Sequence, residues 1–541
     1  MLRSLFPWLR GGSGWKTAQR PIRTRSFVPR LLVLEDRTLP SNFIVNNLAD
    51  SGAGSLRQAI LDANSAGGNN NITFTVIGTV TLQNALPDLT TNVDFEGPGP
   101  GSLSVQRSLA PGTPDFSILT VDWSATVRVA GVMLTNGSGF YGGGIFNDSG
   151  TLTVDNCSVV ANAAWRGGGI LNFGSLTVTG STLSGNVAAN NGGGIANFGP
   201  LTIDHSSLSG NSGDNGGAVY NFGGGNVVLS YSTLSSNSAN FGGAIANNGG
   251  TVTVDSSTVA QNTAAIGGGV GNPYGGTVIV RNSTFAGNTA TYANGGGIAN
   301  DNGAALAVSN STFSGNAAAS GGGIANSGTL TTFDTILAGN LAPAGADLSG
   351  ALGSLGHNLI GNTTGGSGFD ATDLLNVDPW LGSLQYNGGP TPTMALLPGS
   401  PAIDAGDNTG APTFDQRGPG FARIVNGGID IGAFEVQGFA PNVPNQAVPF
   451  APESMLGTAT LFRAPDAPAA AGIAGAAPAE PVVPESAPLE SAGLDWLFAA
   501  ADRHDGSAVR GTGLATRLLW PGQQAHGFDL ESLPQEGEAQ S

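Results

Sequence analysis

The chain has 541 residues, of which 87 are glycine, one is cysteine and 10% are charged. The glycine follows no Gly-X-Y period, which excludes collagen, and 40% hydrophobic residues exclude a wholly disordered chain. A single cysteine excludes an intrachain disulfide framework, and a net charge of −18 argues against nucleic acid as a partner because an acidic surface repels phosphates.

Residues 1–41 form a basic segment. They hold seven arginines and Lys16, against only Glu35 and Asp36. A basic N-terminus is typical of a targeting segment, but its compact apolar run, Leu31–Leu34, is short for a secretory signal. We predict a basic leader here, either a targeting segment or a flexible segment of another use.

A strand and a short helix are predicted next. Phe43–Val45 reads as a first strand, and Ser55 with Gln58 fits the S-x-x-Q capping box. One face of the following helix is apolar, and it carries Leu56, Ala59, Ile60 and Ala63. We expect this helix to cover the open end of the coils that follow, since an uncovered end exposes core and backbone.

Residues 72–134 are predicted to form early, less regular coils. Their extended runs are Ile72–Ile77, Thr79–Leu82, Leu103–Val105, Ile118–Val121 and Thr126–Leu134.

Eight copies of a GG(G/A)(I/V) block follow, spaced 24 to 28 residues apart. They begin at Gly142, Gly167, Gly192, Gly216, Gly242, Gly267, Gly295 and Gly321. An asparagine closes each block: Asn147, Asn172, Asn197, Asn221, Asn247, Asn272, Asn300 and Asn326. A second asparagine follows each: Asn162, Asn186, Asn211, Asn237, Asn262, Asn288, Asn316 and Asn340.

Each repeat reads as three short strands without a helical period. Alternation, as in Thr151–Val154, points one face inward, and a single unit of about 25 residues cannot bury that face alone. Stacked units can, with like positions about 4.8 Å apart. We therefore predict an all-β, right-handed parallel β-helix with asparagine ladders, in preference to a propeller or a sandwich.

The lone Cys157 occupies a column otherwise filled by hydroxyl residues. That column continues as Ser181, Ser206, Ser232, Ser257, Ser283, Ser311 and Thr335. Alternation points it inward, so Cys157 is interpreted as a small core thiol; a nucleophilic role would need a nearby base.

A neighbouring column alternates charged and uncharged coils. It holds Asp155, Asp204 and Asp255, and Arg281 lands beside Asp255. We interpret it as a solvated face, not a row of metal ligands. The calcium-binding nonapeptide of other β-helices is absent. No metal or cofactor is predicted.

After Asn340 the repeat fades. Residues 42–340 are predicted to be the β-helix with its N-terminal cap, and 341–437 final coils with a further module. Residues 438–541, rich in proline and alanine, are predicted to be a mostly disordered tail, with short apolar pieces at Leu494–Ala501 and Leu514–Trp520. Neither piece is long enough to span a bilayer.

The repeat region contains few side chains that could act as a catalytic acid or base. From Gly142 to Asn340 the basic residues are Arg166, His205 and Arg281. Asp204 precedes His205, but neighbours on a strand face opposite sides, so the pair is not expected to act together. The other histidines, His357, His504 and His526, have no partner at metal-ligand spacing. We predict no catalytic residues.

Three phenylalanines each follow a ladder asparagine in successive coils: Phe173, Phe198 and Phe222. Their rings should stack about 4.8 Å apart. They are either a binding strip for sugars or a partner, with Trp165 nearby, or the packing of a turn edge, which we favour from the sequence.

Several motifs resemble bacterial surface proteins. The GG(G/A)I blocks, with Phe285–Asn288 and Phe313–Asn316, resemble the GGAI and FxxN repeats of polymorphic outer-membrane proteins and the pectin-lyase-like group. A second set of motifs resembles the choice-of-anchor Q module, and it runs through Asp378–Gly382, Asn387–Thr393, Leu396–Gly406, Asp415–Gly418 and Asp430–Glu435. Leu34–Leu39 resembles a short leader of exported proteins. The resemblance implies an exported surface β-helix protein.

Together these features predict a non-enzymatic, secreted or cell-surface protein. It would be adhesive or structural, binding polysaccharide or other cell-surface components through its flat sides. The alternative is a pectin-lyase-like enzyme acting on acidic polysaccharide, which a clustered acid–base constellation or product release would reveal. The sequence predicts no transmembrane helix and leaves the oligomeric state open.

Overall fold

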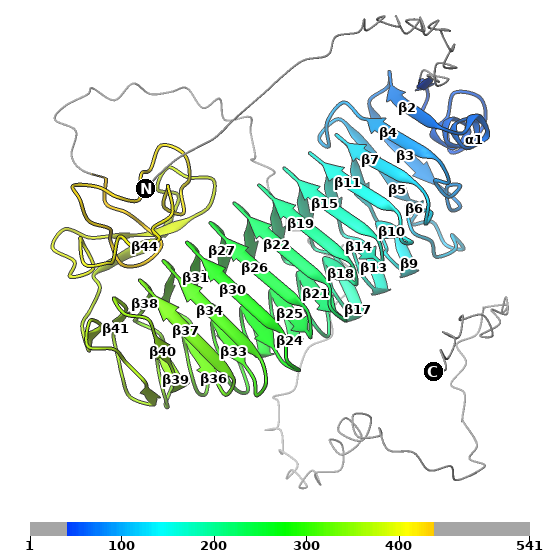
Figure 1. Ribbon diagram of the computed structural model, residues 1–541. Helices are drawn as coiled ribbons and strands as arrows, with labels where there is room; N and C mark the ends of the chain where they lie inside the picture. Colours follow the sequence, from blue (N-terminus) through cyan, green and yellow to red (C-terminus); the bar gives the residue numbers. More distant parts are fainter. Residues whose placement is uncertain (1–39, 438–541) are drawn as a thin grey trace, which may run out of the picture. The chain divides into compact units, whose positions relative to one another are not determined.

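The structure is a computed structural model that describes residues 40–437. In that range the chain winds into stacked coils, and three long parallel sheets run along the stack (Figure 1). The basic leader up to residue 39 and the proline-rich tail from residue 438, with both of its apolar pieces, lie outside the described residues.

Sheets 1 and 2 each contain thirteen strands. Sheet 1 consists of β1 (Ser41–Val45), β2 (Asn69–Phe74), β4 (Asn92–Glu96), β7 (Thr126–Ala130), β11 (Thr151–Asp155), β15 (Ser175–Thr179), β19 (Pro200–Asp204), β22 (Asn226–Ser230), β26 (Thr251–Asp255), β30 (Thr277–Arg281), β34 (Ala305–Ser309), β37 (Thr329–Phe333) and β40 (Gly353–Ser354). Sheet 2 consists of β3 (Gly78–Leu82), β5 (Leu103–Arg107), β8 (Met133–Thr135), β12 (Ser158–Val160), β16 (Thr182–Ser184), β20 (Ser207–Ser209), β23 (Thr233–Ser235), β27 (Thr258–Ala260), β31 (Thr284–Ala286), β35 (Thr312–Ser314), β38 (Ile336–Leu337), β41 (Leu359–Ile360) and β43 (Leu374–Leu375).

Sheet 3 contains eleven strands. It consists of β6 (Leu119–Val121), β10 (Ile145–Asn147), β14 (Ile170–Asn172), β18 (Ile195–Asn197), β21 (Val219–Phe222), β25 (Ile245–Asn248), β29 (Val270–Asn272), β33 (Ile298–Asn300), β36 (Ile324–Asn326), β39 (Leu348–Ala351) and β42 (Gly366–Ser367). Short extra strands lie between sheets 2 and 3 in some coils, namely β9 (Ser138–Tyr141), β13 (Ala163–Arg166), β17 (Val187–Asn191), β24 (Ser238–Phe241), β28 (Thr263–Ile266) and β32 (Thr289–Ala290).

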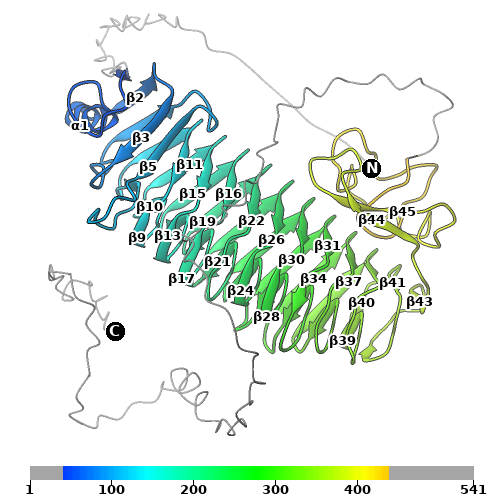
Figure 2. The ribbon, with the colours of Figure 1, turned by 180° about the vertical axis from the view of Figure 1, so that it is seen from behind.

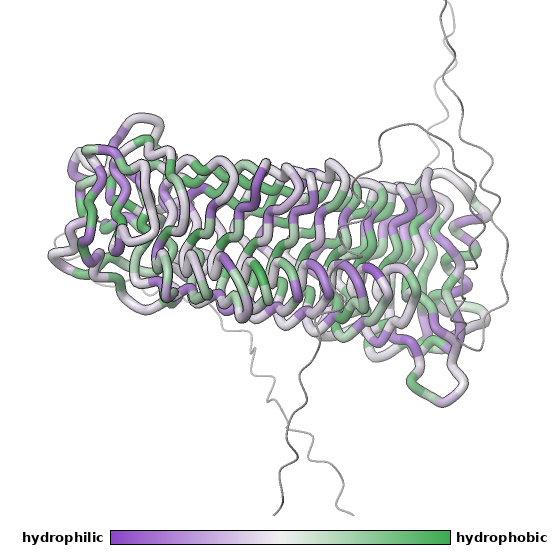
Figure 3. The backbone as a smooth tube through the Cα atoms, turned by 90° about the horizontal axis from the view of Figure 1, so that it is seen from below, coloured by the Kyte–Doolittle hydropathy of each residue, from purple (hydrophilic) through white to green (hydrophobic). Residues whose placement is uncertain are grey.

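Equivalent residues of successive coils pair side by side. Leu152 lies beside Leu176 and Val154 beside Val178, and all of these side chains are buried. Polar and apolar positions therefore recur from coil to coil along the backbone (Figure 3). The predicted parallel β-helix, with three main strands per coil, is confirmed.

Both asparagine ladders are present. In the first, Asn147 Nδ2 donates to Asn172 Oδ1 at 2.6 Å, and the same bond recurs in each coil to Asn326. In the second, Asn162 Nδ2 donates to Asn186 Oδ1 at 3.0 Å, and the bonds continue to Asn340. Burial without partners would cost free energy, so these bonds explain why asparagine occurs inside a solenoid.

Glycine opens each block because the chain turns sharply there. Gly167 has a φ of +66°, in the left-handed region that other residues rarely adopt. At the next position a Cβ on Gly168 would lie 2.5 Å from the carbonyl oxygen of Gly193 in the following coil. The glycines thus allow both the turn and the close stacking of coils.

The helix α1 (Leu56–Ala66) packs against β1 and β2 at the N-terminal end of the stack (Figure 1). Its apolar face is buried as predicted, and Ser55 Oγ accepts the Gln58 backbone N–H at 3.2 Å. The capping box is only half formed, because the Gln58 side chain donates to Asp62 instead. In residues 40–437 no helix has both the length and the apolar character needed to cross a bilayer.

Beyond β43 the chain leaves the coils and forms an irregular segment, residues 376–437, containing the antiparallel hairpin β44 (Leu381–Gln385) and β45 (Thr393–Leu396). Figure 2 shows this segment beside β31 and β41. It binds outward-facing hydroxyls of sheet 2: Thr258 Oγ1 donates to the Pro392 carbonyl at 2.6 Å, and Thr312 Oγ1 accepts the Ala433 N–H at 3.0 Å. We call residues 376–437 the C-terminal module.

Candidate functional site

The three phenylalanines lie next to one another at the ends of sheet 3 strands: Phe173 and Phe198 directly follow β14 and β18, and Phe222 ends β21. The ring centroids of Phe173 and Phe198 are 4.9 Å apart, and those of Phe198 and Phe222 are 5.4 Å apart. The spacing is close to the expected coil rise, but the rings are tilted by 42° and 57° instead of lying parallel. Tilted contacts suit the quadrupole of aromatic rings better than a face-to-face stack.

Five further rings extend this row, and only Trp165 had been noted from the sequence. The ring centroids of Phe146 and Phe173 are 6.1 Å apart, and those of Tyr141 and Phe146 are 5.7 Å apart. Phe140 and Trp165 stack at 6.2 Å beyond Tyr141, and Tyr220 stacks on Phe222 at 6.0 Å at the other end. We call these eight residues the aromatic strip: Phe140, Tyr141, Phe146, Trp165, Phe173, Phe198, Tyr220 and Phe222.

The strip both covers the sheet and faces solvent. Leu171 and Ala196 occupy the outward positions next to Phe146 in β14 and β18, yet both are fully buried. Phe173 and Phe222 nevertheless remain 37% and 41% exposed. Their strands lie on one flank of the coils (Figure 1). Phe173 and Phe222 are therefore partly packed and partly open to solvent, whereas Tyr220 at the end of the strip is only 7% exposed.

Charge is sparse along the strip. Arg166 pairs with Tyr141 across β13 and β9, and Asp148 stands in the coil before Phe173 at the equivalent position. At the other end, Tyr220 accepts a hydrogen bond from Asn248 Nδ2 at 3.1 Å. Tyr220 is only 7% exposed, so at this end the surface offers apolar faces beside the half-buried Asn248 amide.

Cys157 is buried within the hydroxyl column as predicted. Its backbone N–H donates to Ser181 Oγ at 3.0 Å, and Ser181 N–H donates to Ser206 Oγ in the same way. Burial raises the pKa of the Cys157 thiol to about 11. A thiol held neutral in this manner is a poor nucleophile.

Asp204 and His205 do contact each other, so the prediction that they face opposite sides is wrong. His205 lies just after β19 with a φ of +46°, and this turn brings its Nδ1 to 2.8 Å from Asp204 Oδ2. Ser230 Oγ donates to the other oxygen, Asp204 Oδ1, at 2.6 Å. The carboxylate thus stands between serine and histidine, whereas nucleophile activation needs the histidine next to the serine.

The charged column on sheet 1 has the predicted order. Asp155, Asp204 and Asp255 alternate with Thr179 and Ser230 in register. A feature missed from the sequence is Arg128, which bridges Asp94 at 2.9 Å and Asp155 at 2.6 Å across three coils. Within residues 40–437 no cluster of three or more His, Cys, Asp or Glu side chains is placed to hold a metal ion.

A buried polar network fills the C-terminal module. Asp415 and Arg417 form an ion pair at 2.6 Å, and the Arg417 guanidinium lies 4.0 and 3.8 Å from the ring centroids of Phe421 and Phe434. Gln416 Nε2 donates to Thr258 Oγ1 of sheet 2 at 2.9 Å. These residues hold the module together and against the coils.

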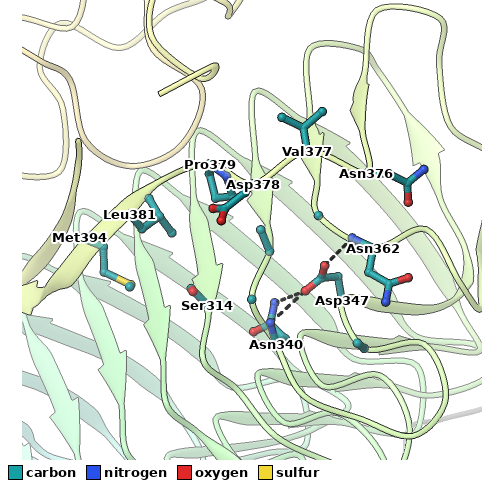
Figure 4. A pocket seen from close by; sticks show the side chains of 14 residues that line it. Ser314, Asn340, Asp347, Asn362, Asn376, Val377, Asp378, Pro379, Leu381 and Met394 are labelled. Carbon is teal, nitrogen blue, oxygen red and sulfur yellow. Dashed lines mark hydrogen bonds between the residues drawn. The ribbon is translucent and has the colours of Figure 1, made fainter. Parts of the chain in front are cut away.

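A pocket of about 530 Å³ lies where the last coils meet the module. Asp347 lines it beside Asn362 and Asp378 (Figure 4). Asp347 Oδ1 accepts both Asn340 nitrogens and Oδ2 accepts the Asn362 N–H, so its carboxylate is engaged in structure. Near the same end, His357 Nδ1 contacts the Ala405 carbonyl oxygen at 3.1 Å. His504 and His526 lie outside the described residues.

No family model matches this chain, and no curated protein matches it. Among solved structures, the crystal structure of pectate lyase Pel9A is similar, with 17% sequence identity and a TM-score of 0.35 over 73% of this chain and 97% of that chain. A likeness of this size carries no conclusion about the activity of this chain.

Proposed function

We propose that this protein is exported and surface-associated, that it has an adhesive or structural role, and that it contacts glycans or other surfaces through the sides of its coils. The aromatic strip is the observation that carries the proposal. Exposed apolar rings in one continuous row, rimmed by polar groups, are typical of an interaction surface. A rigid stack of coils also fixes the rings relative to one another, so a ligand meets a surface that is already ordered.

The candidate catalytic groups support adhesion over chemistry. Cys157 is a buried neutral thiol, and His205 is separated from Ser230 by Asp204. Neither arrangement provides an activated nucleophile.

The motifs similar to the choice-of-anchor Q module supply Asp415, Gln416 and Arg417, which organise the C-terminal module. We propose that this module belongs to a surface-protein architecture, together with the repeats similar to polymorphic outer-membrane proteins.

Fractionation of the source cells tests the proposal. We expect the intact chain in the surface or secreted fraction, and we expect the purified full chain to adhere to isolated cell envelopes. Replacing Phe173, Phe198 and Phe222 by serine should reduce that adhesion. A cytoplasmic location, or adhesion unaffected by the triple substitution, would contradict it.

The alternative is a carbohydrate-active enzyme of the pectin-lyase-like kind. The contact between Asp204 and His205 is the observation in its favour, since it places an acid and a possible base together on an exposed corner. Release of unsaturated or reducing products from polygalacturonate, abolished by Asp204→Ala, would establish this alternative.

A further inference from the structure

The aromatic strip follows the axis of the coils. Phe146, Phe173, Phe198 and Phe222 come from four successive coils, and each ring contacts the next at 4.9 to 6.1 Å. Four coils extend over about 14 Å, because parallel strands repeat every 4.8 Å or so. A ligand that uses the whole strip must therefore be elongated and must present an apolar face at regular intervals.

The charges near the strip restrict the ligand further. Arg166 is the cation next to the strip, while Asp148 stands at its edge and the whole chain has a net charge of −18. A uronic-acid polymer or a nucleic acid needs several cations along its path, and this surface does not offer them. An uncharged ligand meets no such penalty.

The rim supplies amide groups beside one carboxylate. Asn248 and Asn215 are half-buried there, and Asn215 Nδ2 donates to Asn191 Oδ1 at 3.0 Å and to Asp214 Oδ2 at 3.2 Å. Sugar rings combine apolar C–H faces, which stack on aromatic rings, with hydroxyls, which bond to amides.

Resting on the proposed function, we infer that the aromatic strip binds a linear, neutral polysaccharide that lies along the coil axis, with successive sugar units over the rings of successive coils. The repeat of the protein thereby sets the repeat of its ligand. Each sugar–ring contact is weak alone, and several contacts along one chain add up.

Native affinity electrophoresis of the full chain tests this inference. We expect gels containing hydroxyethylcellulose to retard the protein and gels containing polygalacturonate to leave it unretarded. Phe173→Ser, Phe198→Ser and Phe222→Ser together should weaken retardation about tenfold or more. The matched control is Tyr292→Ser, which removes a ring that is 83% exposed and is not part of the strip; it should leave retardation unchanged.

Folding must be separated from binding. The single variant Trp165→Ser removes one ring of the strip that is 43% exposed and stacks on Phe140, so it should weaken retardation while the circular dichroism spectrum stays unchanged. Retardation by polygalacturonate alone, by neither polymer, or equally by the triple variant and the wild type would overturn the inference. Adhesion to envelopes that the triple variant loses, without retardation by the neutral polymer, would leave the proposed function intact and reject only this ligand class.

Discussion

Glu435 is a carboxylic acid enclosed in the C-terminal module. Its Oε2 accepts the Asp430 N–H at 2.8 Å, whereas Oε1 has no protein partner among the described residues. Burial raises the pKa of Glu435 from 4.5 to about 8, and the nearby Arg423, which is fully buried, offsets only part of that shift. The side chain is therefore protonated at neutral pH in the folded chain and ionised in the unfolded chain.

The consequence is a stability that falls as pH rises. A raised pKa in the folded state contributes stability that is complete below pH 4.5 and lost as pH rises through about 8. Burial also raises the pKa of Asp334, to about 6, and of Asp430, so their contributions have the same sign. We expect the free energy of unfolding to drop between pH 5 and pH 8.5, and Glu435→Gln to remove about 2 kcal/mol of that drop. Guanidinium unfolding at pH 5 and pH 8.5 measures this drop in the free energy of unfolding. An equal drop in the Glu435→Gln variant and the wild type would contradict the prediction.

The same physics makes Cys157 inert. With a thiol pKa near 11 and a buried side chain, native Cys157 should react with a disulfide reagent at pH 8 at least about a hundredfold more slowly than the unfolded chain. Cys157→Ser should cost no more than about 1 kcal/mol, because serine fills this position in the next coils, whereas Cys157→Leu should cost about 1–3 kcal/mol by overfilling it. Reaction kinetics and denaturant midpoints check both, and fast labelling of the native chain would show the thiol to be accessible.

At the scale of elements, the asparagine ladders have a direction. Each side-chain amide donates to the side-chain oxygen of the next, higher-numbered coil. The residue that ends a ladder must therefore accept a hydrogen bond, and it has no further residue to which it could donate. Asp347 meets this need in the second ladder: Oδ1 accepts the backbone and side-chain nitrogens of Asn340, and no nitrogen is left over. Asp373 accepts from Asn358 in the same manner at the corner between sheets 1 and 2. A carboxylate ends a ladder where another asparagine would leave a buried N–H unpaired.

This direction predicts different effects for two opposite substitutions. Asp347→Asn should destabilise the chain by about 1–3 kcal/mol, because an amide nitrogen would face the N–H groups of Asn340 or Asn362. Asn316→Asp, within the ladder, removes the donor to Asn340 and adds a buried charge, so its cost should be larger at neutral pH and smaller in acid. Asp378→Asn is the exposed control. Urea midpoints measure all three, and an Asp347→Asn variant as stable as wild type would disprove the terminator role.

The repeating elements could be predicted from the sequence because the repeated residues themselves define how successive coils align. Eight glycine blocks with two asparagines each align the coils without any distant information. The C-terminal module lacks such a period, and its contacts are remote: Gln416 bonds Thr258 across 158 residues. The extra rings of the strip were missed for a related reason, since Tyr141 and Phe146 occupy other positions of the repeat than the Phe173 column. Asp204 and His205 were misjudged because alternation holds only to the end of β19.

At the scale of the whole molecule, each coil contacts mainly its neighbours, so one complete coil is dispensable in principle. Deleting Asn226–Gly250 joins Gly225 to Thr251, which already pairs in register with Asn226. Asn221 then meets Asn272, both ladders close again, and all eight residues of the aromatic strip remain. The deletion also brings Asp255 beside Asp204, so like charges would stand one coil apart.

We therefore expect the chain with this deletion alone to unfold with weak cooperativity. Combined with Asp255→Ser, which restores a hydroxyl donor beside Asp204, the deletion should give a chain that unfolds cooperatively. Removing only residues 226–238 should abolish folding, because half a coil places the strands of sheet 1 over those of another sheet and separates the ladder asparagines. Circular dichroism, the sharpness of thermal unfolding and solubility distinguish the three chains. Equal folding of the half-coil and whole-coil deletions would mean that stacked like positions do not create the interior, since only the whole-coil deletion preserves that stacking.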